Sequence, residues 1–290
     1  MSKPRVVVSL LSKEQDFQAL QATDAQAAAS RASVEIDFVY AKNNSRLQIE
    51  QLYHFINRAK NDRPAGIIAQ TVAADGLPRV AQDAARAAVG WVLLNRDAEY
   101  VGALRAEHRH LGIGIVTIDQ IEIGRIQGRQ LRSLLSNGGN ALYIQGPPEA
   151  YAAQCRLEGV REVLAGSGID LKLLSAEWTE ASSEKAVRSW LQLSASRDFV
   201  LGAVSAQNDA MAIGARNAIA SARPEWVSRP FTGCDGLPDG GQRLVRARCL
   251  AATVIVPPTA GAAIALVAAH PQSPIPPRTV LAPHPFPSAL

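Results

Sequence analysis

The sequence predicts an α/β protein made of two successive halves, each with a parallel β-sheet covered by helices. Short apolar runs alternate with longer amphipathic stretches along most of the 290 residues. Continuous apolar runs such as "AGIIAQ" (65–70) are typical of strands buried on both faces, as parallel strands are. The alternation occurs twice, and a Gly-rich helix stop, "SNGGN" (136–140), lies near the start of the second series.

The first half contains five strand-like runs and three helix-like stretches. "RVVVSLL" is rich in β-branched residues, whereas "SRLQIEQLYHFINRA" repeats apolar residues three and four positions apart. The expected strands are 5–11, 34–41, 65–70, 90–96 and 112–119, and the expected helices are 14–31, 45–59 and 75–88.

The second half continues the same alternation. Its expected strands are 141–146, 170–178 and 199–205, with further apolar stretches at 231–236 and 250–256. Its expected helices are 121–136, 150–166, 181–195, one that Asn208 opens, and 258–269. A Pro-rich tail at 270–290 completes the chain, with no repeat or low-complexity array.

Composition argues against several classes of protein. The chain is 47% hydrophobic and 19% charged, which is typical of a globular protein. The net charge is +4, and only "RLVRAR" (243–248) is locally basic, so we do not expect nucleic-acid binding. No run is long enough for a membrane span, so membrane insertion is not expected.

Residue patterns also argue against cofactors, metals and catalysis. The three cysteines are far apart and form no C-x-x-C pair, and His108 and His110 have no nearby carboxylate pattern that suggests a metal site. G-x-G-x-x-G, P-loop and G-x-S-x-G sequences are absent. We therefore expect no cofactor, no metal site and no enzyme activity.

Polar residues collect where expected strands end. These are Gln70, the Asn95–Arg96 pair, Asp119 with Gln120, Asn208 with Asp209, and Asp235. Ligands of open parallel sheets bind outside the carboxyl ends of the strands, so these side chains could line one cleft. The alternative for each is a helix cap or a turn residue.

Seven stretches in order carry a family resemblance. They are "VVVSLL", "WVLLNRD", "IDQIEIGRIQGRQL", "QCRLEGVREVL", "AQNDAMAIGA", "GCDGLPDG" and "LAATV". With these, the chain resembles the type I periplasmic binding proteins, especially the ribose-binding branch, and the related effector domains of LacI-type regulators. The resemblance implies two Rossmann-like lobes joined by a three-strand hinge, with a ligand cleft between them. Lobe I would be 1–117 plus 257–277 and lobe II 118–256 plus 278–290, with crossovers near Thr117, Val256 and Arg278.

The resemblance also implies a set of ligand-binding residues. From lobe I these are Ser9, Lys13, Phe17, Gln70, Asn95 and Arg96; at the first crossover and in lobe II they are Asp119, Gln120, Arg156, Trp178, Asn208 and Asp235. Carboxylates and amides suit hydroxyl pairs, Arg donates in a fixed fork, and an aromatic ring covers an apolar sugar face. By this matching Asn208 binds the ligand, while Asp209 caps the helix or supports the hinge.

Four departures from the family pattern bear on the ligand. The loop "SKEQDF" replaces Asn-Pro-Phe-aromatic and is one residue longer, and Asn95 replaces the usual Asp of an Asp-Arg pair. Cys234 stands where an aromatic residue is common, and Val256 where a Gln is common. The departures indicate another pentose, a deoxysugar, a sugar acid or a less polar ligand in place of ribose.

The resemblance predicts binding of a small sugar or sugar-like solute, with hinge closure signalling to an ABC importer or a sensor. The alternative is a cytoplasmic LacI-type effector domain without its DNA-binding headpiece, which is disfavoured because the first strand begins near Arg5. The family location is periplasmic if a leader was removed, and cytoplasmic if this is the full chain. A sugar-acting enzyme would need an acid–base pair, and the cleft carboxylates Asp119 and Asp235 resemble hydroxyl acceptors.

Overall fold

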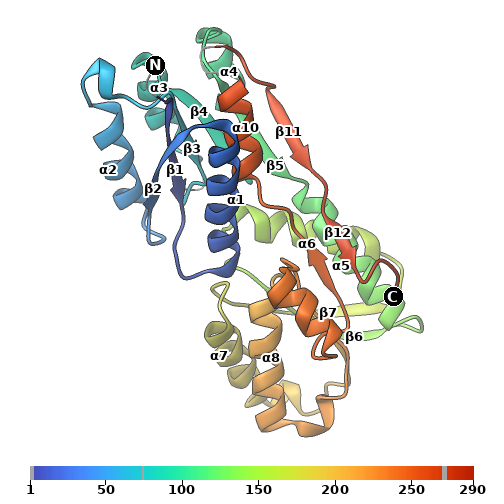
Figure 1. Cartoon of the computed structure of the whole chain (residues 1–290). Coiled ribbons are helices and arrows are strands. Elements are labelled where there is room, and N and C mark those ends of the chain that lie inside the picture. The colour runs from blue at the N-terminus through green and yellow to red at the C-terminus, as the bar shows by residue number, and fades with distance from the viewer. Residues whose placement is uncertain (1–2, 74, 270–272) are drawn as a thin grey trace. The chain divides into compact units, whose positions relative to one another are not determined.

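The computed structural model describes residues 3–73, 75–269 and 273–290. The chain divides into two compact units (Figure 1). Unit 1 comprises Met1–Ile118 and Pro258–Leu281, and unit 2 comprises Asp119–Pro257 and Ala282–Leu290. Each unit is an α/β fold with a parallel sheet, which confirms the predicted fold class.

Unit 1 contains a six-stranded sheet in the order β11-β5-β4-β3-β1-β2, and every neighbouring pair is parallel. The strands are β1 (Arg5–Leu10), β2 (Glu35–Tyr40), β3 (Gly66–Ala69), β4 (Gly90–Leu94), β5 (Ile113–Ile118) and β11 (Arg278–Leu281). Its α-helices are α1 (Asp16–Ala32), α2 (Ser45–Ile56), α3 (Pro78–Arg86), α4 (Tyr100–Glu107) and α10 (Ala260–Ala269), with one 3₁₀ turn at Lys60–Asp62.

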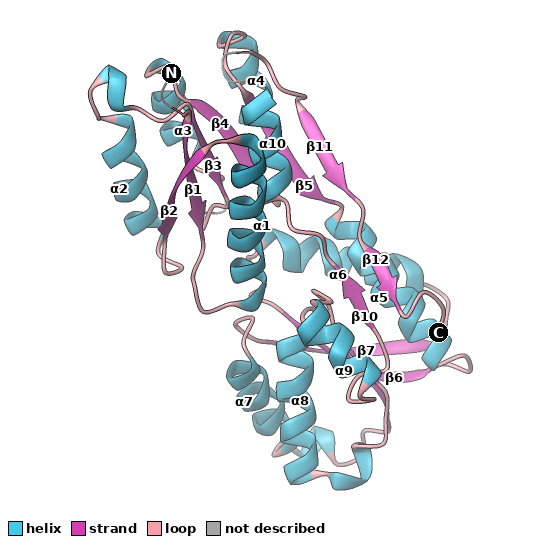
Figure 2. Cartoon of the chain, in the orientation of Figure 1, coloured by secondary structure: helices cyan, strands magenta, loops and turns pink. Residues whose placement is uncertain are grey.

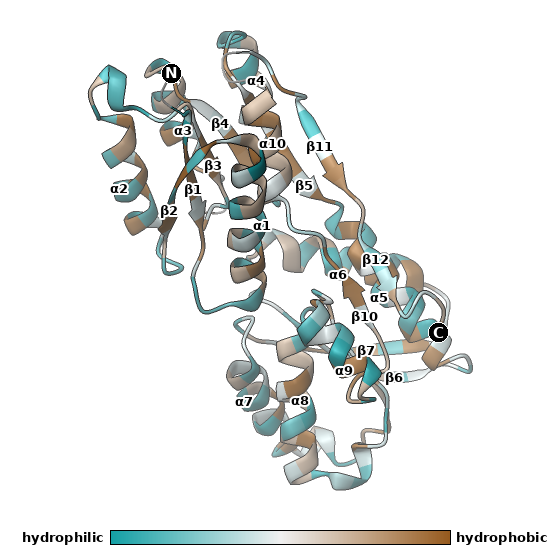
Figure 3. Cartoon of the chain, in the orientation of Figure 1, coloured by the Kyte–Doolittle hydropathy of each residue, from teal (hydrophilic) through white to brown (hydrophobic). Residues whose placement is uncertain are grey.

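The two faces of this sheet form separate cores because successive strand side chains point to opposite sides. Val6 and Val8 of β1 share one apolar core with buried residues of α1 and α10. In Figure 3, which colours the ribbon by hydropathy, α10 runs from white to brown. Val7, between them, packs with Trp91 and with residues of α2, α3 and α4. Burial on both faces explains why the strands appear in the sequence as continuous apolar runs.

Unit 2 contains a four-stranded parallel sheet in the order β7-β6-β8-β9. Its strands are β6 (Gly139–Gln145), β7 (Ile169–Ser175), β8 (Leu201–Ala206) and β9 (Phe231–Thr232). Its α-helices are α5 (Gln120–Leu134), α6 (Tyr151–Leu164), α7 (Glu180–Leu191), α8 (Asp209–Ala222) and the short α9 (Arg243–Arg246). Short helical turns lie at Ser194–Ser196, Pro224–Trp226 and Pro238–Gln242. Beside this sheet, β10 (Thr253–Ile255) and β12 (His284–Phe286) form an antiparallel pair (Figure 2).

Glycines let α5 and α6 approach closely. A Cβ at Gly124 of α5 would collide with the carbonyl oxygen of Arg156, and a Cβ at Gly159 of α6 would collide with that of Ile121. The backbones of the two helices are therefore in contact at Arg156. This packing fixes the backbone of α6 at Arg156.

The structure corrects several boundaries. The third passage was expected near Arg278; in the structure β11 pairs with β5, and Arg278–Leu281 belong to unit 1. The other two passages lie between 118 and 119 and between 257 and 258. Within the apolar stretches at 231–236 and 250–256, the strands extend only over Phe231–Thr232 and Thr253–Ile255. The tail supplies β11 and β12, and α4 was not predicted. None of the helices in the described ranges has the length and apolarity to cross a membrane.

Candidate functional site

The twelve candidate residues divide equally between the units. Ser9, Lys13, Phe17, Gln70, Asn95 and Arg96 belong to unit 1, and Asp119, Gln120, Arg156, Trp178, Asn208 and Asp235 belong to unit 2. Most lie at or just beyond the carboxyl ends of parallel strands or at the first turn of the following helix. Their contacts are described unit by unit.

In unit 1, Gln70 is the centre of a hydrogen-bonded network after β3. Its Oε1 accepts from Gln18 Nε2 at 3.2 Å and from Asn95 Nδ2 at 3.1 Å. Its backbone carbonyl accepts from Gln48 Nε2 at 2.8 Å. Gln48 Nε2 also donates to Ser9 Oγ at 2.9 Å, which joins Ser9 to the same network.

Asn95 is fixed from its other side as well. Its Oδ1 accepts from the hydroxyl of Thr259 at 2.9 Å, and Thr259 Oγ1 in turn accepts from Gln21 Nε2 at 3.0 Å. Asn95 has a φ of 60°, a left-handed conformation that Asn tolerates better than most residues. The turn after β4 thus holds the Asn95 amide in one orientation.

The remaining unit 1 candidates lie outside this network. Lys13 is exposed, with Nζ 4.9 Å from the centroid of the Tyr40 ring. Phe17 lies in the first turn of α1 and is half-buried. Arg96 follows Asn95 and donates from Nη1 to the carbonyl of Ala73 at 2.8 Å. The structure therefore brings Ser9, Gln70 and Asn95 together, and holds Arg96 through a neighbouring loop.

In unit 2, Arg156 of α6 is buried, with 6% of its surface exposed. Its Nε donates to Gln120 Oε1 at 2.9 Å, and its Nη1 donates to the carbonyl of Gln207 at 2.6 Å. Both acceptors are neutral. The guanidinium carbon lies 5.8 Å from the centroid of the Trp178 ring, within the range of a cation–π contact.

Asn208 and Gly146 determine the position of Trp178. Asn208 Nδ2 donates to the carbonyl of Trp178 at 2.9 Å, and a Cβ at Gly146 would collide with the Trp178 ring. Trp178 has a φ of 62°, so its backbone is held in the left-handed region. Gly146 after β6 thus leaves room for the indole beside Arg156.

Asn208 is also the N-cap of α8, because its Oδ1 accepts from the N–H of Met211 at 2.8 Å. The expectation that Asp209 caps this helix was wrong, since the cap lies one residue earlier. Asp209 instead accepts from the Thr253 hydroxyl at 2.6 Å and from the N–H of Gly236 at 2.8 Å. It ties α8 to the segment that leads to β10.

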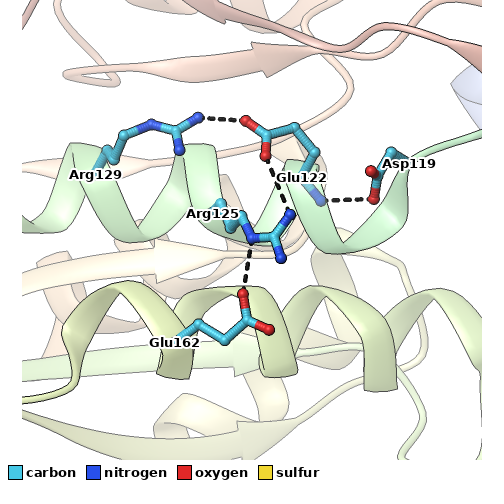
Figure 4. Close-up of polar contacts among 5 residues, drawn as sticks. All are labelled: Asp119, Glu122, Arg125, Arg129 and Glu162. Carbon is cyan, nitrogen blue, oxygen red and sulfur yellow. Dashed lines mark hydrogen bonds and ion pairs between the residues drawn. The ribbon is translucent and has the colours of Figure 1, made fainter.

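Asp119 is likewise an N-cap, because its Oδ1 accepts from the N–H of Glu122 at 2.9 Å. Figure 4 shows this cap beside an exposed ion-pair cluster. Glu122 pairs with Arg125 at 3.6 Å and with Arg129 at 2.5 Å, and Arg125 reaches Glu162 of α6 at 2.7 Å. Exposed ion pairs of this kind contribute little stability.

Asp235 lies in a turn with a φ of 99°, and its carbonyl accepts from the N–H of Val256 at 3.1 Å. The preceding residue, Cys234, is fully buried. Burial raises the pKa of its thiol from 9.0 to about 12, since the thiolate would lose its hydration. Cys234 is therefore a small core residue rather than a nucleophile.

Sequence reasoning missed the residues that orient the candidates. Gln18, Gln21, Gln48 and Gln207 are buried, and each hydrogen-bonds a candidate directly or through one residue. A Gln on an amphipathic helix usually indicates an exposed position. A recoverable signal was that Gln18, Gln21 and Gln48 fall on the apolar sides of their helices.

The fold and the two polar clusters define a bilobal α/β protein of the kind that carries polar groups at the carboxyl ends of its strands. The sequence matches the periplasmic binding protein domain over residues 6–270, and the chain belongs to that family. No group of three or more His, Cys, Asp or Glu side chains suited to a metal was found among the described residues.

Two curated proteins and one solved structure are among those similar to this chain. It is 29% identical to a "Putative rhizopine-binding protein" of Rhizobium meliloti over 210 residues, which cover 71% of this chain and 64% of the relative. It is 29% identical to a xylitol-binding protein of Mycolicibacterium smegmatis over 212 residues, 72% of this chain and 55% of the relative. The chain thus spans less than two thirds of both curated relatives. A Bacillus halodurans ABC transporter solute binding protein, solved with myo-inositol, superposes with a TM-score of 0.83 at 19% identity, covering 98% of this chain and 95% of that one.

Proposed function

We propose that this protein binds a small sugar or sugar-like solute rich in hydroxyl groups. The observation that carries the proposal is Arg156, a guanidinium buried beside the Trp178 ring and held by two neutral oxygens. Burying a charge is costly unless strong hydrogen bonds compensate. A ligand with several oxygens would add charge-assisted bonds there, while the indole would cover an apolar face.

The comparisons support the same class of ligand. The two curated relatives are named for rhizopine and xylitol, and the similar solved structure was determined with myo-inositol. All three are binding proteins, which favours a receptor over an enzyme or a LacI-type regulator. We therefore assign no catalytic role to any residue of this chain.

The proposed mechanism uses both units. Ser9, Gln70, Asn95 and Arg96 would contact the ligand from unit 1, while Arg156, Trp178, Asn208 and Asp235 would contact it from unit 2. A ligand that binds both sets stabilises the closed state over the open one, which is a hinge-type shift of population. The closed form would then be recognised by an ABC importer or a sensor.

A thermal-shift screen against pentoses, hexoses, deoxysugars, polyols, cyclitols and sugar acids tests this proposal. A ligand at 100 times its Kd stabilises the folded state by about 2.7 kcal/mol, which a melting curve resolves. We expect a selective shift that Arg156→Ala abolishes. Arg161→Ala is the matched control, because Arg161 lies exposed on the same helix. Absence of any shift across the panel would contradict the proposal.

A further inference from the structure

The orientation of each side-chain amide around Gln70 is fixed by a backbone N–H group. Gln18 Oε1 accepts from the N–H of Leu11 at 3.1 Å, so its Nε2 must be the group that donates to Gln70. Gln48 Oε1 accepts from the N–H of Val72 at 2.9 Å, so its Nε2 donates to Ser9 Oγ and to the Gln70 carbonyl. A backbone N–H can only donate, which makes these assignments unambiguous.

The same reasoning fixes Asn95. Gln21 Oε1 accepts from the N–H groups of Thr259 and Ala260 at 2.9 and 2.8 Å, so its Nε2 donates to Thr259 Oγ1. The Thr259 hydroxyl has one proton, and its short contact is the 2.9 Å bond to Asn95 Oδ1 rather than the 3.5 Å contact to Gln21 Oε1. Asn95 Nδ2 must therefore face Gln70 Oε1.

The hydrogen bonds within the network consequently leave Gln70 and Asn95 with more unused donors than acceptors. Gln70 Oε1 already accepts two hydrogen bonds, while Gln70 Nε2 has no acceptor among the residues that the structure describes, and the side chain is half-buried. Asn95 Nδ2 keeps one N–H, while Asn95 Oδ1 accepts from Thr259 and keeps one lone pair. The Arg96 guanidinium follows directly and adds positive charge.

The carboxylates of the adjoining loops have partners of their own. Asp97 forms a two-pronged contact with Arg278, at 2.8 and 3.1 Å. Asp75 accepts from the N–H of Leu77, and Glu14 accepts from the N–H of Lys13. Asn95 stands where the family resemblance led us to expect a carboxylate. The Gln70 and Asn95 side chains, which together form the Gln70–Asn95 edge, therefore carry more unused N–H groups than unused oxygens, and neither oxygen is charged.

We propose that the ligand group held by Gln70 and Asn95 is a carboxylate, so the solute is an acidic sugar derivative such as an aldonic or uronic acid. A hydroxyl that accepted these bonds would still have to donate its own proton, and these two side chains keep only one lone pair, on Asn95 Oδ1, to receive it. A carboxylate oxygen only accepts. Bonds to an ionised oxygen are also roughly twice as strong as neutral ones. The inference rests on the proposed binding function and names the class of its ligand.

Isothermal titration with matched pairs tests it: galactose against galacturonate and galactonate, and glucose against glucuronate and gluconate, with xylitol and myo-inositol as neutral polyols. We expect at least one acid to bind about tenfold or more tightly than its neutral partner, which corresponds to about 1.4 kcal/mol. Tighter or equal binding of the neutral partners would overturn the inference while leaving the proposed function intact. No binding by any compound would overturn both.

The substitution Gln70→Glu provides a more specific test of the same inference. It keeps the acceptor for Gln18 and Asn95 but replaces the outward donor by a charged oxygen at constant size. We expect the affinity for the acid to fall about tenfold or more, so that the ratio of acid affinity to neutral-partner affinity decreases. Gln26→Glu, which adds the same charge at an exposed position of α1, should leave both affinities unchanged. If Gln70→Glu does not fold, Asn95→Asp tests the same edge. An unchanged preference in the folded variant would contradict the inference.

Discussion

The hydroxyl of Thr253 donates a 2.6 Å hydrogen bond to Oδ1 of Asp209, and both side chains are buried. Oδ2 of Asp209 accepts from the N–H of Gly236 at 2.8 Å. One carboxylate thus joins the first residue of α8 to β10 and to the turn that carries Asp235. The candidate residues at 208 and 235 therefore depend on Asp209 for their relative position.

Thr253→Val removes this hydroxyl and keeps the shape of the side chain. A hydrogen bond to a charged group contributes about 1.5–3 kcal/mol, and a buried carboxylate would lose one donor. We expect a loss of that size in the free energy of unfolding, measured by urea denaturation. Thr23→Val, at an exposed site on α1, should change stability by less than about 0.5 kcal/mol. Equal effects of the two substitutions would contradict the role of Asp209.

Asn208→Ala should reduce both stability and ligand affinity. The substitution removes the cap of α8, worth about 0.5–2 kcal/mol, and also the bond to the Trp178 carbonyl. Asn44→Ala is the matched control, because Asn44 caps α2 through the N–H of Leu47 at an exposed site. We expect Asn44→Ala to lower stability alone. If both variants bind the selected ligand as the native chain does, Asn208 is only a cap.

Gly124→Ala should destabilise unit 2 and weaken binding together. The added methyl meets the backbone carbonyl of Arg156, which cannot move without displacing α6. Overpacking of this kind costs about 1–3 kcal/mol. Gly102→Ala in α4 meets nothing within 4 Å and should be neutral or stabilising by up to about 1 kcal/mol. Melting curves with and without ligand separate the two effects, and a neutral Gly124→Ala would contradict the close packing of α5 on α6.

The buried thiol of Cys234 predicts a loss of stability at alkaline pH. Its pKa is raised from 9.0 to about 12, so the folded state keeps a proton that the unfolded state releases. The stabilisation is complete below about pH 9 and is lost as the pH rises towards 12. Between pH 8 and pH 10.5 the native chain should lose about 2 kcal/mol more than Cys234→Ala. An identical pH dependence in the two proteins would exclude this contribution.

Thiol labelling gives an independent check on the same residue. Cys155 and Cys249 are partly exposed, whereas Cys234 is fully buried. At pH 8 we expect Cys234 to react with a thiol reagent only after denaturation, because both access and the thiolate are lacking. Rapid labelling of Cys234 in the folded protein, located by peptide mass analysis, would contradict its burial.

Most of the fold could be predicted because parallel strands buried on both faces leave strong apolar signals. The strand β11 could not, since its burial alternates along a Pro-rich tail and its partner β5 lies far away in the sequence. The helix α4 was missed because it is short, contains Gly102, and has no side-chain cap. In both cases tertiary contacts, rather than the local sequence pattern, determine the element.

The candidate site was predicted less completely than the fold. Strand ends identified Gln70, Asn95 and Asn208, because polar residues there interrupt apolar runs. The orientation of their amides depends on Gln18, Gln21 and Gln48, which come from two other helices. No pattern in the sequence reports which atom of an amide is already hydrogen-bonded and which is left for another partner. That information comes from the backbone N–H groups that fix each donor and acceptor.

The most direct measurement is a crystal structure of the chain with the solute that the screen selects. The account predicts one ligand molecule with an oxygen within hydrogen-bond distance of Gln70 Nε2 and another within reach of the Arg156 guanidinium, with the Trp178 ring against an apolar face. A ligand that contacts only one of these two sets, or that binds elsewhere on the chain, would contradict it.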